Sequence, residues 1–140
     1  MPSVKAVMTP FPWAVDIDDP VTRAEDIMRE HDVRHVPVEE RGELVGVATQ
    51  RDIGLLVNTA LDVKSRSRIR VRQVCVRDPF VVDHSTPLDQ VLREMTERHI
   101  GSALVVRKGR LAGIFTVTDA CRVLAEILEA RFDRGGGDAA

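Results

Sequence analysis

The stretch Gly46-Val-Ala-Thr-Gln-Arg-Asp52 occurs a second time in the chain, as Gly113-Ile-Phe-Thr-Val-Thr-Asp119. The two copies are 67 residues apart, and the same offset holds on both sides of them. Residues 4–62 align with residues 71–129 without a gap, and 15 of the 59 pairs are identical. Chance would give roughly four identities for such a composition. The sequence therefore predicts two copies of one structural unit.

The residue pattern of each copy predicts a strand, a helix, two strands and a second helix. Residues 14–17 and 80–83 are short apolar stretches followed by a proline that suits the start of a helix. Apolar residues then recur at helical spacing, as Val21, Ala24, Ile27 and Met28 and as Leu88, Val91, Leu92 and Met95. We expect hairpins of strands 36–38 and 44–48 and of strands 103–106 and 111–115, with turns at Arg41-Gly42 and Lys108-Gly109. The closing helices carry Ile53, Leu56, Val57, Ala60 and Leu61, and Ala120, Val123, Leu124, Ile127 and Leu128.

The predicted fold class is α+β, with two β-α-β-β-α repeats packed about a pseudo-two-fold axis. A unit of about 60 residues buries too little apolar surface to be stable alone, so the two copies should pack against each other. We place the first repeat at residues 1–63, a basic connection at 64–70, the second repeat at 71–133 and a disordered tail at 134–140.

The composition is that of a folded, water-soluble chain. Of 140 residues 44% are hydrophobic and 30% charged, and the net charge of −2 argues against a general polyanion binder. No apolar run reaches the roughly 18 to 20 residues that span a bilayer, and residues 1–12 lack the apolar segment of a secretory signal. We expect a cytoplasmic protein without membrane contact. Cys75 and Cys121 lack metal-ligand spacing, and we interpret both as small buried residues.

The duplicated Gly-x-x-Thr-x-x-Asp motif resembles that of the cystathionine β-synthase (CBS) domain pair, or Bateman module. The resemblance covers residues 4–130 and includes Val7-Met-Thr-Pro10, followed by Val15, and the stretches His31–Val38 and His99–Val106, taken as counterparts. It implies a stand-alone regulatory module that binds an adenosine-containing ligand in clefts between the repeats. AMP, ADP, ATP and S-adenosylmethionine are all compatible with it.

The resemblance also implies that each cleft combines residues of both repeats. One predicted site consists of Thr9, Trp13, Val33, Arg34, Ile114, Thr116 and Asp119. The other consists of Val76, Phe80, Ile100, Gly101, Val47, Thr49 and Asp52. The first set has a hydroxyl and a cation, in Thr9 and Arg34, where the second has Val76 and Gly101. We therefore expect the first cleft to be better suited to phosphate.

The Thr and Asp of each motif allow two interpretations. Thr49 and Thr116 lie where a strand runs into a helix N-terminus, which favours phosphate, while Asp52 and Asp119 could accept ribose hydroxyls. The same spacing also fits a capping box, in which the two side chains satisfy the free amides of the helix start. Trp13 and Phe80 could likewise stack on a base or fill the core.

Other clusters point to weaker hypotheses. The basic stretch 64–72 would present its cations on one face if extended; it is either a solvated linker, a nucleic-acid contact, or a source of one arginine, from Arg66, Arg68 or Arg70, that folds over a cleft. Four histidines, His31, His35, His84 and His99, have no metal-site spacing, and we expect His31 and His99 at helix ends.

No arrangement of nucleophile and base appears, so we expect no enzyme. We expect a homodimer through the closing helices, with contacts at Leu56, Ala60, Val123 and Ile127, and an effector protein of unknown identity. The alternative is an interaction module that dimerises without binding a small molecule.

Overall fold

The computed structural model describes residues 1–10, 13–57 and 63–132. The predicted tail 134–140 lies outside these ranges. So do Ala60, a predicted dimer contact, and Leu61, a predicted apolar position of the first closing helix. The elements of the first half are η1 (Val4–Ala6), β1 (Thr9–Pro10), β2 (Val15–Asp16), α1 (Val21–His31), β3 (His35–Glu40), β4 (Glu43–Thr49), α2 (Gln50–Val57) and α3 (Val63–Arg66). Those of the second half are η2 (Val71–Gln73), β5 (Val76–Arg77), β6 (Val81–Asp83), α4 (Leu88–Arg98), β7 (Ser102–Arg107), β8 (Arg110–Thr116) and α5 (Val117–Phe132). The predicted α+β fold of two repeats is confirmed.

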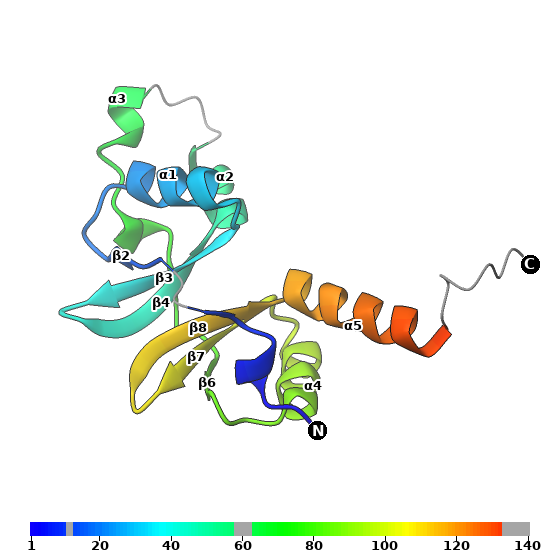
Figure 1. The fold of residues 1–140 in the computed structure, drawn as a ribbon. Coiled ribbons are helices and arrows are strands. Elements are labelled where there is room, and N and C mark those ends of the chain that lie inside the picture. The colour runs from blue at the N-terminus through cyan, green and yellow to red at the C-terminus, as the bar shows by residue number, and fades with distance from the viewer. Residues whose placement is uncertain (11–12, 58–62, 133–140) are drawn as a thin grey trace, which may run out of the picture.

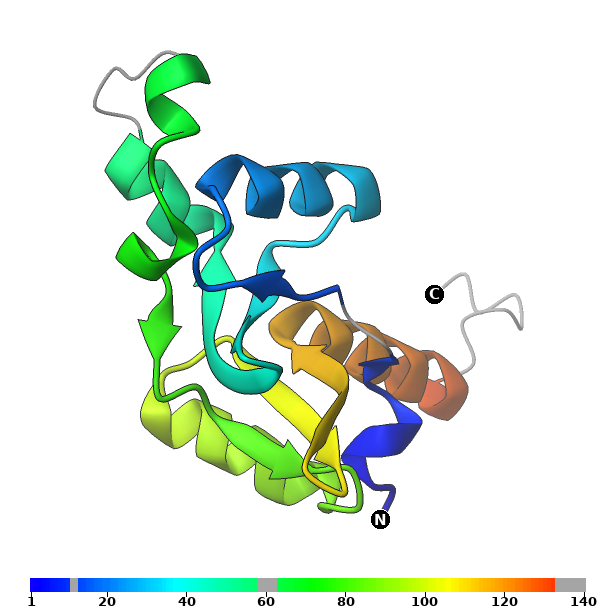
Figure 2. The ribbon, with the colours of Figure 1, turned by 90° about the vertical axis from the view of Figure 1, so that its left-hand side faces the viewer.

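The two repeats exchange their leading strands. One four-stranded sheet has the order β2-β3-β4-β5, and the other has the order β1-β8-β7-β6. Strand β1, at the start of the chain, therefore pairs with the second repeat, and β5 pairs with the first. Figures 1 and 2 show the N-terminal segment beside α4 and α5, at the opposite end of the molecule from α1 and α2. Each repeat is completed by a segment that precedes the other.

Local sequence explains how each repeat turns. Both hairpin turns have two residues of positive φ, Arg41 and Gly42 in one and Lys108 and Gly109 in the other, as a type I′ turn requires. Helices α1 and α4 both end on a residue in the left-handed region, Asp32 and His99 respectively. Asp32 is thus the counterpart of His99, and the sequence comparison that set His31 against His99 was wrong by one residue. Both histidines do lie at helix ends, as predicted.

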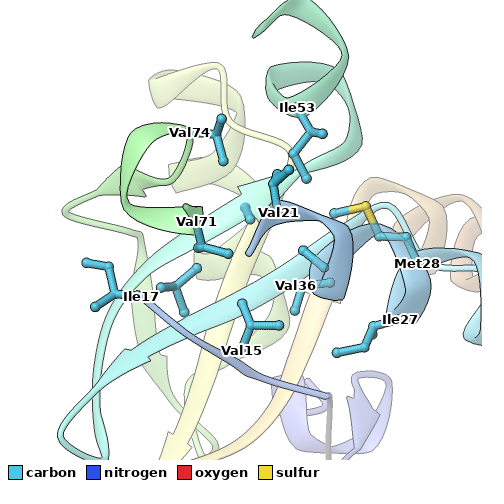
Figure 3. Packing of buried hydrophobic residues seen from close by; sticks show 12 residues of the cluster. Val15, Ile17, Val21, Ile27, Met28, Val36, Ile53, Val71 and Val74 are labelled. Carbon is cyan, nitrogen blue, oxygen red and sulfur yellow. The ribbon is translucent and has the colours of Figure 1, made fainter. Parts of the chain in front are cut away.

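The exchanged segments also complete the two hydrophobic cores. Val71 and Val74 join the cluster of the first repeat, together with Val15, Val21 and Ile53 (Figure 3). Val4 is fully buried in the cluster of the second repeat. Burial of a valine side chain contributes roughly 1.5–3 kcal/mol. Because these valines belong to the other half of the sequence, neither core is complete without its neighbour.

The basic connection does not extend as a row of cations. Arg66 and Arg70 contact residues of the first repeat, and the hypothesis that Arg68 folds over a cleft stays a prediction. Part of the segment is helical, in α3 and η2. Arg66 pairs with Glu25 at 2.8 Å, and Arg70 donates to the carbonyl oxygen of Asp18. Arg72 pairs with both Asp18 and Glu40, at 3.1 and 3.0 Å. These contacts fasten the connection to the first repeat.

The two cysteines are not buried as predicted. Cys121 is exposed and Cys75 is only half-buried, so that prediction was wrong. Residue type alone does not determine which neighbours cover a side chain.

In the described part of the chain, none of the helices has the length and apolar character needed to cross a membrane.

Two glycines allow the exchanged strands to approach closely. A Cβ atom on Gly113 would lie 2.7 Å from the carbonyl oxygen of Thr9, and one on Gly46 would lie 2.6 Å from that of Val76. Such distances are shorter than atoms in contact permit, so a side chain at either position must push β1 or β5 away.

We predict that Gly113→Ala lowers the free energy of unfolding by about 1–3 kcal/mol, because β1 loses its register on β8. Gly101→Ala is the matched control, since its Cβ would make only ordinary contacts of 3.7 Å or more. Urea denaturation of both variants measures the difference. Equal stability of the two variants would contradict the close approach.

Candidate functional site

A cavity of about 350 Å³ lies between the two repeats. It is lined by Thr9, Asp32, Val33, Arg34, His35, Ile114, Thr116, Thr118 and Asp119. Six of the seven residues of the first predicted site are in this set, and the seventh, Trp13, is not. The structure therefore brings together residues that are more than 100 positions apart in the sequence.

The exchanged strand positions this group. Thr9 lies opposite Ile114 in the pairing of β1 with β8, which places its hydroxyl beside the junction of β8 and α5. Thr116 ends β8, and α5 begins at the next residue. Arg34 is exposed and directly precedes β3 on the other wall of the cavity. A helix start, a hydroxyl and an exposed cation thus face one space.

Asp119 is the one buried charged residue in the described ranges, with 7% of its surface exposed. Its Oδ2 accepts hydrogen bonds from the Thr116 amide at 2.9 Å and the Thr116 hydroxyl at 3.2 Å. Its Oδ1 accepts from the Thr9 hydroxyl at 3.1 Å and from Arg122 Nη2 at 3.1 Å. The Asp119 amide in turn donates to Thr116 Oγ1 at 3.4 Å. The capping interpretation is therefore confirmed for this pair, and Thr9 and Arg122 add two donors to it.

The equivalent pair in the first repeat is less complete. The Asp52 amide donates to Thr49 Oγ1 at 3.1 Å, which is half of a capping box. Within residues 1–10, 13–57 and 63–132 no donor reaches the Asp52 carboxylate. The two motifs are identical in pattern, yet one carboxylate is fully engaged and the other is available.

The second predicted set is gathered less tightly. Val47 and Val76 are partners across β4 and β5, and Thr49 and Asp52 follow at the end of β4. Phe80 and Ile100 pack against the core of the second repeat, and the Arg98 guanidinium lies 5.0 Å from the centre of the Phe80 ring. Phe80 thus serves as a core residue with a cation beside it. Gly101 lies next to His35 of the first repeat. A Cβ atom added to this glycine would lie 3.7 Å from His35 Nε2.

His35 was not singled out by the sequence analysis, although it lies between the two predicted sites. It lines the cavity and also contacts the region of Gly101. Burial is the main cause that lowers the pKa of His35; the Arg34 charge lowers it further and Asp52 opposes the change. The side chain is therefore a neutral imidazole at pH 7. Its position one residue after Arg34 was the only available signal.

Trp13 does not fill the core, so that interpretation was wrong. Its side chain is 41% exposed, and its ring stacks on the His31 imidazole with the centroids 3.5 Å apart. The stacking partner is at the last residue of α1, outside the cavity lining. Among the residues that the structure describes, no group of three or more His, Cys, Asp or Glu side chains could hold a metal ion.

One protein-family model matches this chain twice. The model of the CBS domain matches residues 4–54 and again residues 71–126. The chain belongs to the CBS domain family. The fold and its duplication are those that this family predicts, so the resemblance stated from the sequence is confirmed.

Similar proteins align with nearly the whole chain. A CBS domain-containing protein of Dictyostelium discoideum is 24% identical over 135 residues, which is 90% of this chain and 93% of that protein. A putative acetoin utilization protein (AcuB) from Vibrio cholerae has a TM-score of 0.79 and 26% identity, covering 95% and 97% of the two chains. The CBS domain pair of protein MJ0100, solved with 5′-methylthioadenosine and S-adenosyl-L-methionine, has a TM-score of 0.75 and 25% identity, covering 89% and 97%.

An enzyme also matches in part. The chain is 28% identical over 116 residues to inosine-5′-monophosphate dehydrogenase of Staphylococcus haemolyticus, and it spans only 22% of that protein.

We predict that the two motif carboxylates differ in their contribution to stability. Asp119→Ala removes an acceptor from a buried network of four donors and should lower the free energy of unfolding by about 2–4 kcal/mol. Asp52→Ala leaves its own amide bonded to Thr49 and should cost less than about 1 kcal/mol. Chemical denaturation of the two variants tests this, and equal losses would contradict it.

Proposed function

We propose that this chain is a regulatory CBS module that binds an adenosine-containing ligand, of the AMP, ADP or ATP class, in the cavity between Arg34 and the start of α5. Occupancy passes to an effector protein through a change in shape or association. The observation that carries the proposal is the convergence of Thr9, Arg34, Thr116 and Asp119 on one cavity.

The chemistry of the cavity supports a nucleotide. Its volume of about 350 Å³ lies within the range of roughly 300–1000 Å³ that is typical of small-molecule sites. The N-terminal turn of α5 faces it through Thr116 and Thr118, and a helix N-terminus favours an anion. Arg34 adds a guanidinium, which suits phosphate better than any neutral group. The apolar side chains of Val33 and Ile114 provide a surface for the base.

The comparisons support the adenosine part of the ligand. The MJ0100 domain pair was solved with two compounds that contain adenosine, 5′-methylthioadenosine and S-adenosyl-L-methionine. Neither of these carries a phosphate, so S-adenosylmethionine remains an alternative ligand. Arg34 favours the phosphate-bearing compounds. The match to the dehydrogenase spans 22% of that enzyme, and the proposal assigns no catalysis and no resident cofactor to this chain.

Location and other partners follow from the same features. The two free thiols, Cys75 and Cys121, fit the reducing cytoplasm. A nucleic-acid contact through residues 64–72 is disfavoured, because Arg66 and Arg72 already pair with carboxylates.

We predict that Arg34→Ala weakens AMP, ADP and ATP by about tenfold or more and weakens adenosine by less than twofold, because only phosphate uses the guanidinium. Isothermal titration across these four ligands makes the comparison. Arg29→Ala, which removes an exposed cation of the same repeat, is the control. An equal loss for adenosine and its phosphates would show that Arg34 does not bind phosphate.

The exposed apolar surface of α5 supports self-association. It is also compatible with the alternative function, an interaction module that binds no small molecule. Helix α5 extends beyond the body of the second repeat (Figure 1). Four apolar side chains along α5 are 45–62% exposed: Leu124, Ile127, Leu128 and Phe132. In the first repeat, Leu55 and Leu56 on α2 are exposed as well. An apolar cavity of about 490 Å³ lies beside α5, lined in part by Leu88, Leu92 and Val123. Surfaces of this kind mark protein contacts.

We predict that the protein is a homodimer, with twice the 15.6 kDa mass of one chain in light scattering at micromolar concentration. Ile127→Lys should yield a monomer, because it places a charge in the apolar stripe. Glu126→Lys, a neighbouring exposed position on the same helix, is the control and should remain dimeric. A monomer mass for the unmodified protein would end this proposal.

A further inference from the structure

Arg122 is an unexpected member of the candidate site. Its Nη2 atom donates to Asp119 Oδ1 at 3.1 Å and to the carbonyl oxygen of Val7 at 3.0 Å. One amino group therefore bridges the buried carboxylate and the N-terminal segment that leads into β1. The Arg122 side chain is 53% exposed, whereas the Asp119 side chain is 9% exposed.

The carboxylate of Asp119 has no unused acceptor position. A carboxylate offers about four lone-pair sites. Thr9 and Arg122 occupy those of Oδ1, while the amide and hydroxyl of Thr116 occupy those of Oδ2. A ribose hydroxyl could bond to this carboxylate only if a present donor leaves, and each donor that leaves makes room for one hydroxyl.

The four donors differ in how easily they can leave. Thr116 is fixed by the capping box, and its amide belongs to the backbone. Thr9 is held in β1, which pairs with β8. Arg122 is a flexible, half-exposed side chain on the surface of α5, and water can solvate its guanidinium when it turns outward. Arg122 is therefore the donor that a ligand displaces at least cost.

The first repeat provides an internal comparison. The residue equivalent to Arg122 is Leu55, which is 68% exposed and cannot donate. The equivalent carboxylate, Asp52, has no hydrogen-bond donor among the described residues. The duplication thus contains one carboxylate covered by a cation and one that is open, and the covering residue differs between them.

We propose that Arg122 is an internal competitor for a ribose hydroxyl, one that occupies Oδ1 of Asp119 in the ligand-free protein and must be displaced when an adenosine ligand bonds to that oxygen. This inference rests on the proposed function and adds to it a residue that sets affinity. Arg122 thereby lowers affinity for any ligand with a free ribose diol. Since the same amino group holds Val7, its displacement also releases a contact of the N-terminal segment.

The test is the affinity of Arg122→Leu, which introduces the side chain found in the first repeat. Adenosine should bind this variant about three- to fivefold more tightly than it binds the unmodified protein, the factor expected when a half-exposed ion pair no longer competes. The gain should be absent for 2′,3′-dideoxyadenosine, which lacks both hydroxyls. Arg131→Leu, the same change at another exposed position of α5, should leave both affinities unchanged.

Isothermal titration gives the affinities, and thermal denaturation shows whether each variant is folded. If Arg122→Leu is unstable, Arg122→Gln removes the charge while it retains a polar side chain, and a smaller gain for adenosine is expected. Unchanged or weaker binding of adenosine by the folded variants would overturn this inference while the proposed function stands. If neither the unmodified protein nor the variants bind adenosine or its phosphates, both proposals fall.

Discussion

The exchange of leading strands is the constraint on which the rest of this structure depends. Strand β1 completes the sheet of the second repeat and β5 completes that of the first, and each is preceded by a 3₁₀ turn whose valine is buried in the core it joins. Neither half can bury its apolar surface alone, so folding of the two repeats must be coupled. The exchange also has a functional consequence, because it brings Thr9 to the start of α5. A site at this place requires residues from both ends of the chain.

The strand-helix-strand-strand-helix order within each repeat could be predicted from the sequence because it depends on local patterns, whereas the exchanged strands β1 and β5 were not predicted. Helical periodicity fixed the helices, and the Arg-Gly and Lys-Gly turns fixed the hairpins. Six of the nine residues that line the cavity were also predicted, but through the family resemblance and not from spacing. The other three, Asp32, His35 and Thr118, were missed, and Trp13 was placed there wrongly. The side-chain environments were harder. Cys121 and Trp13 are exposed, and the arginines of the connection pair with Glu25, Asp18 and Glu40, because such contacts depend on tertiary neighbours that no local pattern specifies.

The two interpretations of the Thr-x-x-Asp motif are not exclusive, and the structure shows how they combine. The capping box at Thr116 and Asp119 engages the Asp119 amide, and the Val117 amide donates to the Gly101 carbonyl oxygen, so the start of α5 is held at the edge of the cavity. The positive end of the helix dipole is thereby held in a fixed position. The cap therefore prepares the place where phosphate would bind, while the carboxylate that forms the cap is no longer free for another partner.

Divergence between the repeats then determines how the two sites can differ. Thr9 and Arg34 in one site correspond to Val76 and Gly101 in the other, so that the hydroxyl and the cation both belong to the cavity of Asp119. Arg122 corresponds to Leu55, and it covers the carboxylate of the same cavity. His35 lies between the two predicted sites, next to Gly101 on one side and along the cavity on the other. The duplicated motif thus has more charge around Asp119, and fewer polar neighbours around Asp52 in the described part of the chain. Under the proposed function, these substitutions would by themselves give the two places unequal affinity for a ligand.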